Sequence, residues 1–434
     1  MPSVSVASDR AKTDATFTHR NTGFILILIF LLALALRLAV MVATSSYHIG
    51  NSIDDYFGFG TEMGRVARSL AEGNGFSSPM PSPTGPTAIV GPLYPLLLAL
   101  IFRIFGIYST RSAIVILTLQ CIISSSTCFF VYLCGRDTVG ETAGKLASFV
   151  WAIFPLSILF SSTRIWETSL SGMLAAALFW YMLPLRQSVS VSRWMKTGAL
   201  LAIAALVNTS LVVLAIPFVL AAVWRTRMRV CLPATAAALS FVALASPWLI
   251  RNYVEFGRVM LRSNFPLEFR VGNNEFTHGQ KVVELHPARS PLLNQHWHDL
   301  GEKLFMAEES KLNSKFVSAY PRQFAFATLN RAVNYWTGSW VVPTADYPNS
   351  WPVIIGISTL SLLGFVGVYR MLSNGNSAAF VYALCFAVYP LVYYLTTSQP
   401  RFYHTIAPLI IASGAFGLVD IKNRIARAPW LGHD

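Results

Sequence analysis

Apolar runs of about the length that a helix needs to cross a lipid bilayer recur along the whole chain of 434 residues. Hydrophobic residues make up 54% of the sequence and charged residues only 12%, roughly half of what a soluble domain carries. The pattern predicts an all-α, polytopic membrane protein that forms a single membrane domain, residues 1–434. The clearest candidate spans are Phe24–Thr44, Ser112–Cys134, Lys145–Phe160, Thr168–Leu185, Val230–Ile250, Trp351–Arg370, Ala379–Thr396 and Phe402–Val419.

A further long apolar run lies between Lys196 and Trp224, and Asn208-Thr209-Ser210 interrupts it. Polar residues in the middle of the run favour two short helices that meet at Asn208. The chain is therefore expected to cross the membrane about ten times, with both ends on the cytoplasmic side.

The segment "PLYPLLLALIFRIFG", from Pro92 to Gly106, is too short to span. If it crossed, the basic loop Arg225–Arg229 and the basic C-terminal tail would lie outside, against the positive-inside rule. We therefore expect it in a first extracytoplasmic loop, residues 45–111, with juxtamembrane helices. A second large outer loop is expected at residues 254–350.

The net charge of +13 lies in short loops and does not form a patch interleaved with aromatics, so nucleic-acid binding is excluded.

The first outer loop contains "DDYFGFGTEMGRVARSLAEGNGF", whose apolar positions predict an amphipathic helix from Gly60 to Glu72. Glu62 and Arg65 fall on its polar side, and Asp54 and Asp55 precede it. A carboxylate here is suited to act as a general base toward a hydroxyl group. The alternative is structural: an aspartate caps the helix and Glu62 pairs with Arg65 on an exposed face.

A second acid, Glu167, begins an apolar helix in "SSTRIWETSL", on the same predicted side of the membrane. It either joins a functional site or only suits the helix dipole. Cations suited to holding a phosphate are expected on that side too, unless they only snorkel to the surface. They are Arg111, Arg251, Arg262, Arg401 and His404.

No metal-ligand spacing is apparent, and the five cysteines lie in or beside apolar segments. We predict no metal ligands, no certain cofactor, and at most a divalent cation that helps to hold a phosphate.

The motifs "ARSLAEGNGFSSP", "TGPTAIVGPLYPLLLALIFRIFG", "IWETSL", "NTSLVVLAIPF" and "PWLIRNYVEFGRV" occur in an order that resembles the GT-C superfamily of bacterial membrane glycosyltransferases. The nearest groups in pattern are protein O-mannosyltransferase-like and aminoarabinose transferase-like. The resemblance implies inverting transfer of a sugar from a polyprenyl-phosphate donor to a glycan, lipid or protein acceptor. It places this reaction on the outer face of the bacterial plasma membrane.

The resemblance also implies a first-loop carboxylate as the base and a second acid, which Glu167 matches. The usual first-loop acid lies about one helical turn earlier, where this chain has Gly58 or Phe59. The base is therefore Glu62, Asp55 or Asp54, with Glu62 favoured. The remaining predicted substrate contacts are Arg65, Tyr94, Arg103, Arg251, Arg401 and His404.

The rival interpretation is a transporter or flippase for a lipid-linked sugar. Transporters often show broken helices in corresponding positions of two halves. Only the break at Asn208 is visible in the sequence, and the candidate acids lie at an outer surface, which favours the enzyme.

Overall fold

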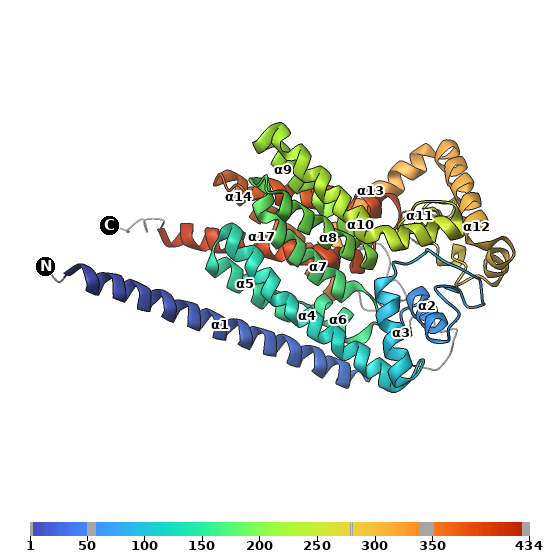
Figure 1. The fold of residues 1–434 in the computed structure, drawn as a ribbon, viewed down its shortest axis with the longest axis horizontal. Helices are drawn as coiled ribbons and strands as arrows, with labels where there is room; N and C mark the ends of the chain where they lie inside the picture. Colours follow the sequence, from blue (N-terminus) through green and yellow to red (C-terminus); the bar gives the residue numbers. More distant parts are fainter. Residues whose placement is uncertain (1–2, 50–57, 278, 280, 339–350, 428–434) are drawn as a thin grey trace.

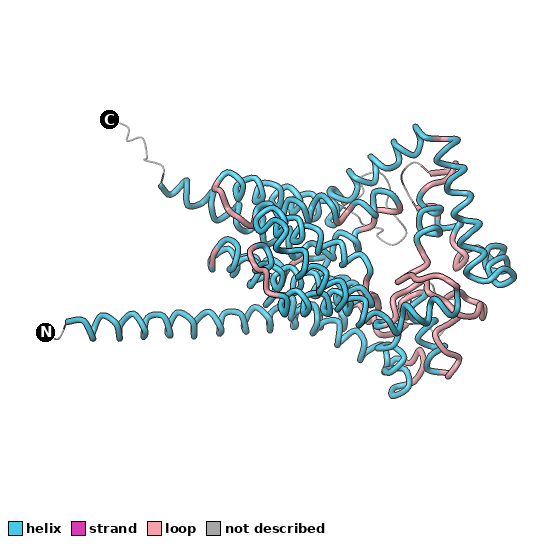
Figure 2. The backbone as a smooth tube through the Cα atoms, turned by 45° about the horizontal axis from the view of Figure 1, so that its top comes forward, coloured by secondary structure: helices cyan, strands magenta, loops and turns pink. Residues whose placement is uncertain are grey.

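The computed structural model describes residues 3–49, 58–277, 279, 281–338 and 351–427, and every regular element in this part of the chain is helical. Figure 1 shows a bundle of long helices with a smaller helical unit at one end. Both termini lie at the other end of the bundle, and most of the longer loop segments gather in the smaller unit (Figure 2). This arrangement confirms the predicted all-α, polytopic fold.

Within the described residues, the bundle contains seven helical segments that are long and apolar enough to cross a membrane, and an eighth if the bent pair α5–α6 is one span. Its helices are α1 (Ser3–Ala43), α4 (Thr110–Val139), α5 (Glu141–Ile153), α6 (Pro155–Thr163), α7 (Thr168–Met182), α8 (Val191–Val207), α9 (Ala215–Thr226), α10 (Cys231–Phe256), α14 (Trp351–Ser373), α15 (Ala379–Val388), α16 (Leu391–Leu395) and α17 (Pro400–Arg427). The 3₁₀ helices η1 (Leu183–Arg186), η2 (Thr209–Leu214) and η3 (Arg227–Val230) extend three of them.

Two of the ten predicted spans form helices shorter than a full span. The first, α8, has 17 residues and ends where Asn208 adopts an extended backbone and accepts a hydrogen bond from the Ser210 amide (3.1 Å). This Asn side chain starts η2 and confirms two short helices that meet at Asn208. The second is the pair α15–α16, which Pro390 separates.

The bend of 47° between α5 and α6 is stabilised by a buried arginine from α1. Pro155 has no amide hydrogen, so the break leaves main-chain carbonyls without helical partners. The Arg37 guanidinium donates to the carbonyls of Ala152 (3.0 Å) and Trp151 (3.4 Å), and to the Ser157 hydroxyl (2.7 Å). An arginine inside an apolar helix is costly unless it is partnered in this way.

Close backbone contact joins α14 to α17. A Cβ added at Gly367 would lie 1.9 Å from the Ser413 carbonyl oxygen, so only glycine permits this approach. Small residues at helix crossings are typical of membrane bundles, because van der Waals packing replaces the hydrophobic effect there. The contact holds α17, which carries Arg401, in the centre of the bundle.

The smaller unit, here called the outer unit, is built from both predicted outer loops. Its elements are α2 (Glu62–Ala71), α3 (Leu93–Phe105), α11 (Phe265–Gly272), η4 (Val283–Leu285), α12 (Pro291–Ala319) and α13 (Pro321–Thr337). Met63 and Val66 of α2 share one buried core with Leu98 of α3, and with Trp297 and Phe305 of α12. The two loops therefore fold against each other.

The segment Pro92–Gly106 forms α3, which has 13 residues. Such a helix is about 20 Å long, shorter than the hydrocarbon core of a bilayer. Tyr94, Leu98 and Phe102 are buried in the outer unit, whereas Leu96 and Leu100 are exposed. The helix is thus shorter than a membrane span, and its place in an extracytoplasmic loop stays a prediction.

Replacement of Arg37 tests the role of the α5–α6 break. Arg37→Leu leaves two buried carbonyls short of donors, at about 1–3 kcal/mol for each unsatisfied group. We expect a clearly lower thermal unfolding midpoint in detergent. Arg111→Leu makes the same chemical change at an exposed position and serves as the control. Equal midpoints for the two variants would contradict this role.

Candidate functional site

The first loop reaches the α6–α7 turn through a glycine. Gly60 has φ +94°, and a Cβ there would lie 2.7 Å from the Ile165 carbonyl oxygen. Both the left-handed backbone and the close approach favour glycine. Glu62 lies two residues after this contact with the turn that carries Glu167.

Two residues on the polar side of α2 are buried, against the structural alternative in which Glu62 pairs with Arg65 on an exposed face. Arg65 is only 2% exposed, and Ser69 is buried too. The chain after α2 folds back over this side, where the Ser69 hydroxyl donates to the Gly75 carbonyl (3.1 Å) and lies 2.7 Å from the Ser77 hydroxyl. The spacing of apolar residues predicted the helix correctly, but this spacing does not show which segments cover each face of α2. Charged groups on a buried face need partners or a ligand.

Glu62 faces a buried histidine from the second outer loop. Glu62 Oε1 lies 3.7 Å from His286 Nε2, and its Oε2 accepts a hydrogen bond from the Thr61 hydroxyl. The Ala288 amide donates to His286 Nδ1 (3.1 Å). A neutral His286 ring must therefore carry its proton on Nε2, the nitrogen that points at Glu62.

The pKa values of this pair leave the carboxylate ionised. Burial raises the pKa of Glu62, but His286, the Thr61 hydroxyl and the Arg65 charge outweigh burial and lower the pKa to about 2. Burial lowers the pKa of His286 to about 4, against the attraction of Glu62. At neutral pH a carboxylate therefore faces a neutral imidazole, and Arg65 supplies the nearby positive charge.

Arg65 has donor capacity that the described residues do not use. Its Nη1 donates to the Pro79 carbonyl at 3.4 Å, a long contact. Its Nη2 is buried and has no hydrogen-bond partner in the described ranges. Asp54 and Asp55, the other two candidate bases, lie outside those ranges. A buried, incompletely partnered guanidinium next to a carboxylate is suited to bind an anion such as phosphate.

The second acid lies in the same electrostatic environment. Glu167 precedes α7 and directly follows Trp166. The Arg401 guanidinium, at the start of α17, lies 5.1 Å from the centre of the Trp166 ring. Burial lowers the pKa of Arg262, and the charges of Glu167 and Glu268 oppose this shift. Arg262 also donates to the Ile89 carbonyl (2.9 Å). Both acids and these arginines thus surround one region.

Gln120 of α4 connects Tyr94 to the turn before α7. Tyr94 donates to Gln120 Oε1 (2.7 Å), which also accepts from the Trp166 amide (3.1 Å). Gln120 Nε2 donates to the Arg164 carbonyl (2.8 Å). Burial raises the pKa of Tyr94 and the charge of Glu167 adds to the shift, so Tyr94 borders the same region.

A buried carboxylate in α12 joins the loops that form the site. Glu302 accepts hydrogen bonds from the Thr87 hydroxyl, the Ala88 amide (2.8 Å) and the Ser263 hydroxyl (2.6 Å). Burial raises the pKa of Glu302, and these bonds oppose the rise. Because Thr87 and Ser263 belong to different outer loops, Glu302 fixes the position of one loop relative to the other.

Three predicted substrate contacts lie apart from this region. Arg103 is exposed and donates to the Leu70 carbonyl (3.0 Å), which joins α3 to α2. Arg251 donates to the carbonyls of Thr87 (2.6 Å) and Phe76 (2.9 Å), so its guanidinium holds the first loop. His404 is fully buried against the rings of Trp151 and Phe160, inside the bundle. Their contacts in this structure are structural, and substrate binding by them stays a prediction.

The region collects more positive than negative charge. Its cations are Arg65, Arg262, Lys281 and Arg401, and its carboxylates are Glu62, Glu167 and Glu268. Sequence reasoning did not identify His286, Glu268, Lys281 or Glu302, because they occur singly in a polar loop or helix without a motif. Within the described residues, no group of three or more His, Cys, Asp or Glu side chains is arranged to hold a metal ion.

Comparison with protein families gives one match. The family described as dolichyl-phosphate-mannose-protein mannosyltransferase matches residues 88–250, which include Tyr94 and Glu167 but not Glu62. No curated protein matches the chain by sequence.

Solved structures resemble the whole chain. The archaeal oligosaccharyltransferase AglB from Archaeoglobus fulgidus, in complex with an inhibitory peptide and a dolichol-phosphate, has a TM-score of 0.56 and 15% identity over 94% of this chain and 51% of its own. A crystal structure of the Archaeoglobus fulgidus oligosaccharyltransferase in complex with Zn and sulfate has a TM-score of 0.55 and 14% identity. The match covers 92% of this chain and 49% of that chain. ArnT from Cupriavidus metallidurans, bound to undecaprenyl phosphate, has a TM-score of 0.43 and 12% identity over 94% and 81%.

The chain thus spans about half the length of the AglB chains that it matches. At these identities the likeness to AglB shows the fold. Together with the family match, it confirms the resemblance to the GT-C superfamily.

Glu302→Gln tests whether this carboxylate holds the two loops together. The variant keeps the shape of the Glu302 side chain but replaces one acceptor oxygen by an NH₂ group. We expect a loss of about 1–3 kcal/mol in local stability. Hydrogen exchange at residues 87–89 and 263 should become faster. Glu308→Gln, on the same helix but exposed, is the matched control. Unchanged exchange in Glu302→Gln would contradict the role.

Proposed function

We propose that the chain is an inverting glycosyltransferase that moves a sugar from a polyprenyl-phosphate donor to an acceptor hydroxyl, with Glu62 as the base. The observation that carries the proposal is an ionised, partly exposed Glu62 beside a buried, incompletely partnered Arg65 on α2. The family match supports glycosyl transfer from a lipid phosphate. The dolichol-phosphate in the AglB complex supports the same donor class by analogy.

The proposed reaction is a single displacement. The acceptor oxygen attacks the anomeric carbon, and Glu62 takes the proton of the acceptor hydroxyl. The bond between the anomeric carbon and the phosphate oxygen breaks, and its electron pair leaves with the phosphate. Arg65, with Arg262 and Arg401 nearby, stabilises the negative charge that develops there. One displacement inverts the anomeric centre, whereas retention needs a covalent intermediate.

Donor binding also prepares the base. In the free protein, Arg65 helps to lower the pKa of Glu62 to about 2, which makes its carboxylate a weak base. A phosphate bound at Arg65 offsets that positive charge and raises the pKa of Glu62. Glu62 is then a stronger base with the donor bound than without it.

His286 is a positioning residue in this proposal. Its ring is 2% exposed and held by the Ala288 amide, so Nε2–H points at Glu62 Oε1 in the neutral form. The contact at 3.7 Å is longer than a hydrogen bond, and a small movement of the carboxylate would close it. We infer that His286 keeps one Glu62 oxygen oriented while the other receives the proton.

The partners of the proposed enzyme follow the same chemistry. A lipid-phosphate donor enters from the membrane, which fits an integral membrane protein with an outer unit beside its bundle. The acceptor is a glycan, lipid or protein hydroxyl on the outer face of a bacterial plasma membrane. A divalent cation that helps to hold the phosphate stays a prediction.

The direct test is sugar transfer by purified protein from a polyprenyl-phosphate sugar. Glu62→Gln should lower the rate by about 100- to 10,000-fold, the usual contribution of a general base. Glu72→Gln, an exposed acid that follows the same helix, should retain activity. Full activity in Glu62→Gln, with loss in Asp54→Asn, Asp55→Asn or Glu167→Gln, would move the base to that residue.

The same preparation separates the enzyme from its rival. A glycosyltransferase consumes the donor and forms a product with the opposite anomeric configuration. Movement of the lipid-linked sugar between leaflets, without its consumption, would establish a transporter instead.

The pH dependence of kcat/KM tests the role of His286. Glu62 must be ionised, so activity is present above its pKa and is lost as the pH falls through it. His286→Leu removes the polar partner of Glu62. The effect of burial then has less to oppose it, so the pKa of Glu62 rises. The acidic limb should therefore move to higher pH. His286→Gln retains an N–H donor but not the positive charge of the protonated ring, so its limb should move by less than that of His286→Leu. A limb that does not move in His286→Leu would contradict the positioning role.

A further inference from the structure

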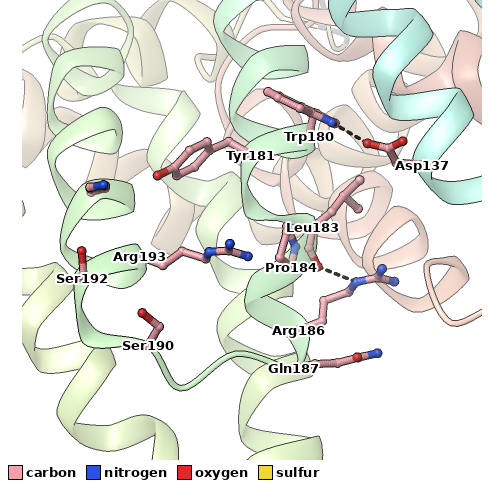
Figure 3. A pocket seen from close by; sticks show the side chains of 11 residues that line it. Asp137, Trp180, Tyr181, Leu183, Pro184, Arg186, Gln187, Ser190, Ser192 and Arg193 are labelled. Atoms are coloured by element: carbon pink, nitrogen blue, oxygen red, sulfur yellow. Dashed lines mark hydrogen bonds between the residues drawn. The ribbon is translucent and has the colours of Figure 1, made fainter. Parts of the chain in front are cut away.

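Figure 3 shows the side chains that line a cavity of about 690 Å³, at the end of α7 that lies away from Glu167. It is formed where α4 and α7 end and α8 begins. Its lining residues are Asp137, Trp180, Tyr181, Leu183, Pro184, Arg186, Gln187, Ser190, Ser192, Arg193 and Lys196. Neither Glu62 nor any other candidate catalytic residue contributes to it, so the glycosyl-transfer proposal leaves this cavity unexplained.

The cavity contains positive charge that its own residues do not neutralise. Its one carboxylate, Asp137, is already paired with Arg136 (2.6 Å) and accepts a hydrogen bond from Trp180 (2.7 Å). Arg186 donates to the Leu183 carbonyl (2.9 Å), as Figure 3 shows, and not to an acid. Within the described residues, Arg193 and Lys196 have no ion-pair partner.

The lining joins these cations to an apolar wall. Trp180, Tyr181, Leu183 and Pro184 line the same cavity as the charged side chains (Figure 3). Trp and Tyr are typical of the membrane–water interface. Arginine binds phosphate oxygens through its planar fork, and basic pockets between helices on the cytoplasmic side hold lipid head groups. The volume is within the range of small-ligand sites.

We propose that this cavity binds a phosphate group, with Arg186, Arg193 and Lys196 as its cationic contacts. The phosphate comes from the head group of an anionic phospholipid in the inner leaflet or from a soluble phosphate. The apolar wall favours the lipid, because a head group presents its phosphate beside acyl chains.

The experiment measures lipid binding by the full chain. The protein is placed in nanodiscs of phosphatidylcholine alone or with phosphatidylglycerol, and retained lipids are counted by native mass spectrometry. Arg193→Gln/Lys196→Gln removes two exposed charges from the cavity. It should bind phosphatidylglycerol roughly 30-fold more weakly. Arg227→Gln/Arg229→Gln removes two exposed charges from the next loop at the same end and should bind normally.

A second arm identifies the source of the phosphate. Inorganic phosphate is added to phosphatidylcholine nanodiscs, and the thermal unfolding midpoint is recorded. A midpoint that rises in the unmodified protein but not in Arg193→Gln/Lys196→Gln supports the site and assigns it a soluble phosphate. Equal weakening of phosphatidylglycerol binding in both double variants would show a general effect of the basic face and overturn the proposal. The absence of any response to either phosphate source would also overturn the proposal.

Discussion

The site depends on the three hydrogen bonds that converge on Glu302. They join the segment around Thr87 to the segment around Ser263, and the Ser263 amide adds a main-chain bond to the Ala88 carbonyl (2.9 Å). Once they are joined, the Ile89 carbonyl meets the Arg262 guanidinium, and the second loop covers α2. A buried carboxylate is expensive, and the molecule meets that cost with donors from both loops. The chain after α2 covers the polar face of that helix, where Arg65 and Ser69 are buried.

Burial of that face explains why the charges around it are suited to chemistry. Removed from water, Glu62 and Arg65 interact more strongly than they would at a surface. Their neighbours leave the region with more cations than carboxylates, and Arg65 Nη2 has no partner in the described residues. An entering anion therefore gains attraction, and it also changes the basicity of Glu62. In this account, donor binding and activation of the base are one electrostatic event.

The sequence predicted the fold better than the site. The apolar runs, the break at Asn208 and the short Pro92–Gly106 helix follow from local composition and from charge near the helix ends. Glu62, Arg65 and Glu167 were identifiable because they interrupt apolar or amphipathic patterns. His286 and Glu302 were not identifiable, because their importance arises from loop packing over long sequence separations. Arg251 was identifiable from its position at a helix end. In this structure its guanidinium binds main-chain carbonyls, and a substrate contact stays a prediction.

The most direct test of the central claim is the position of a bound donor phosphate. A structure of the protein with a polyprenyl phosphate should place a phosphate oxygen within hydrogen-bond distance of Arg65 Nη2 and close to Glu62. The account predicts that the same phosphate lies on the side of α2 that faces His286. A phosphate bound elsewhere, with Arg65 Nη2 paired to Asp54 or Asp55, would contradict it.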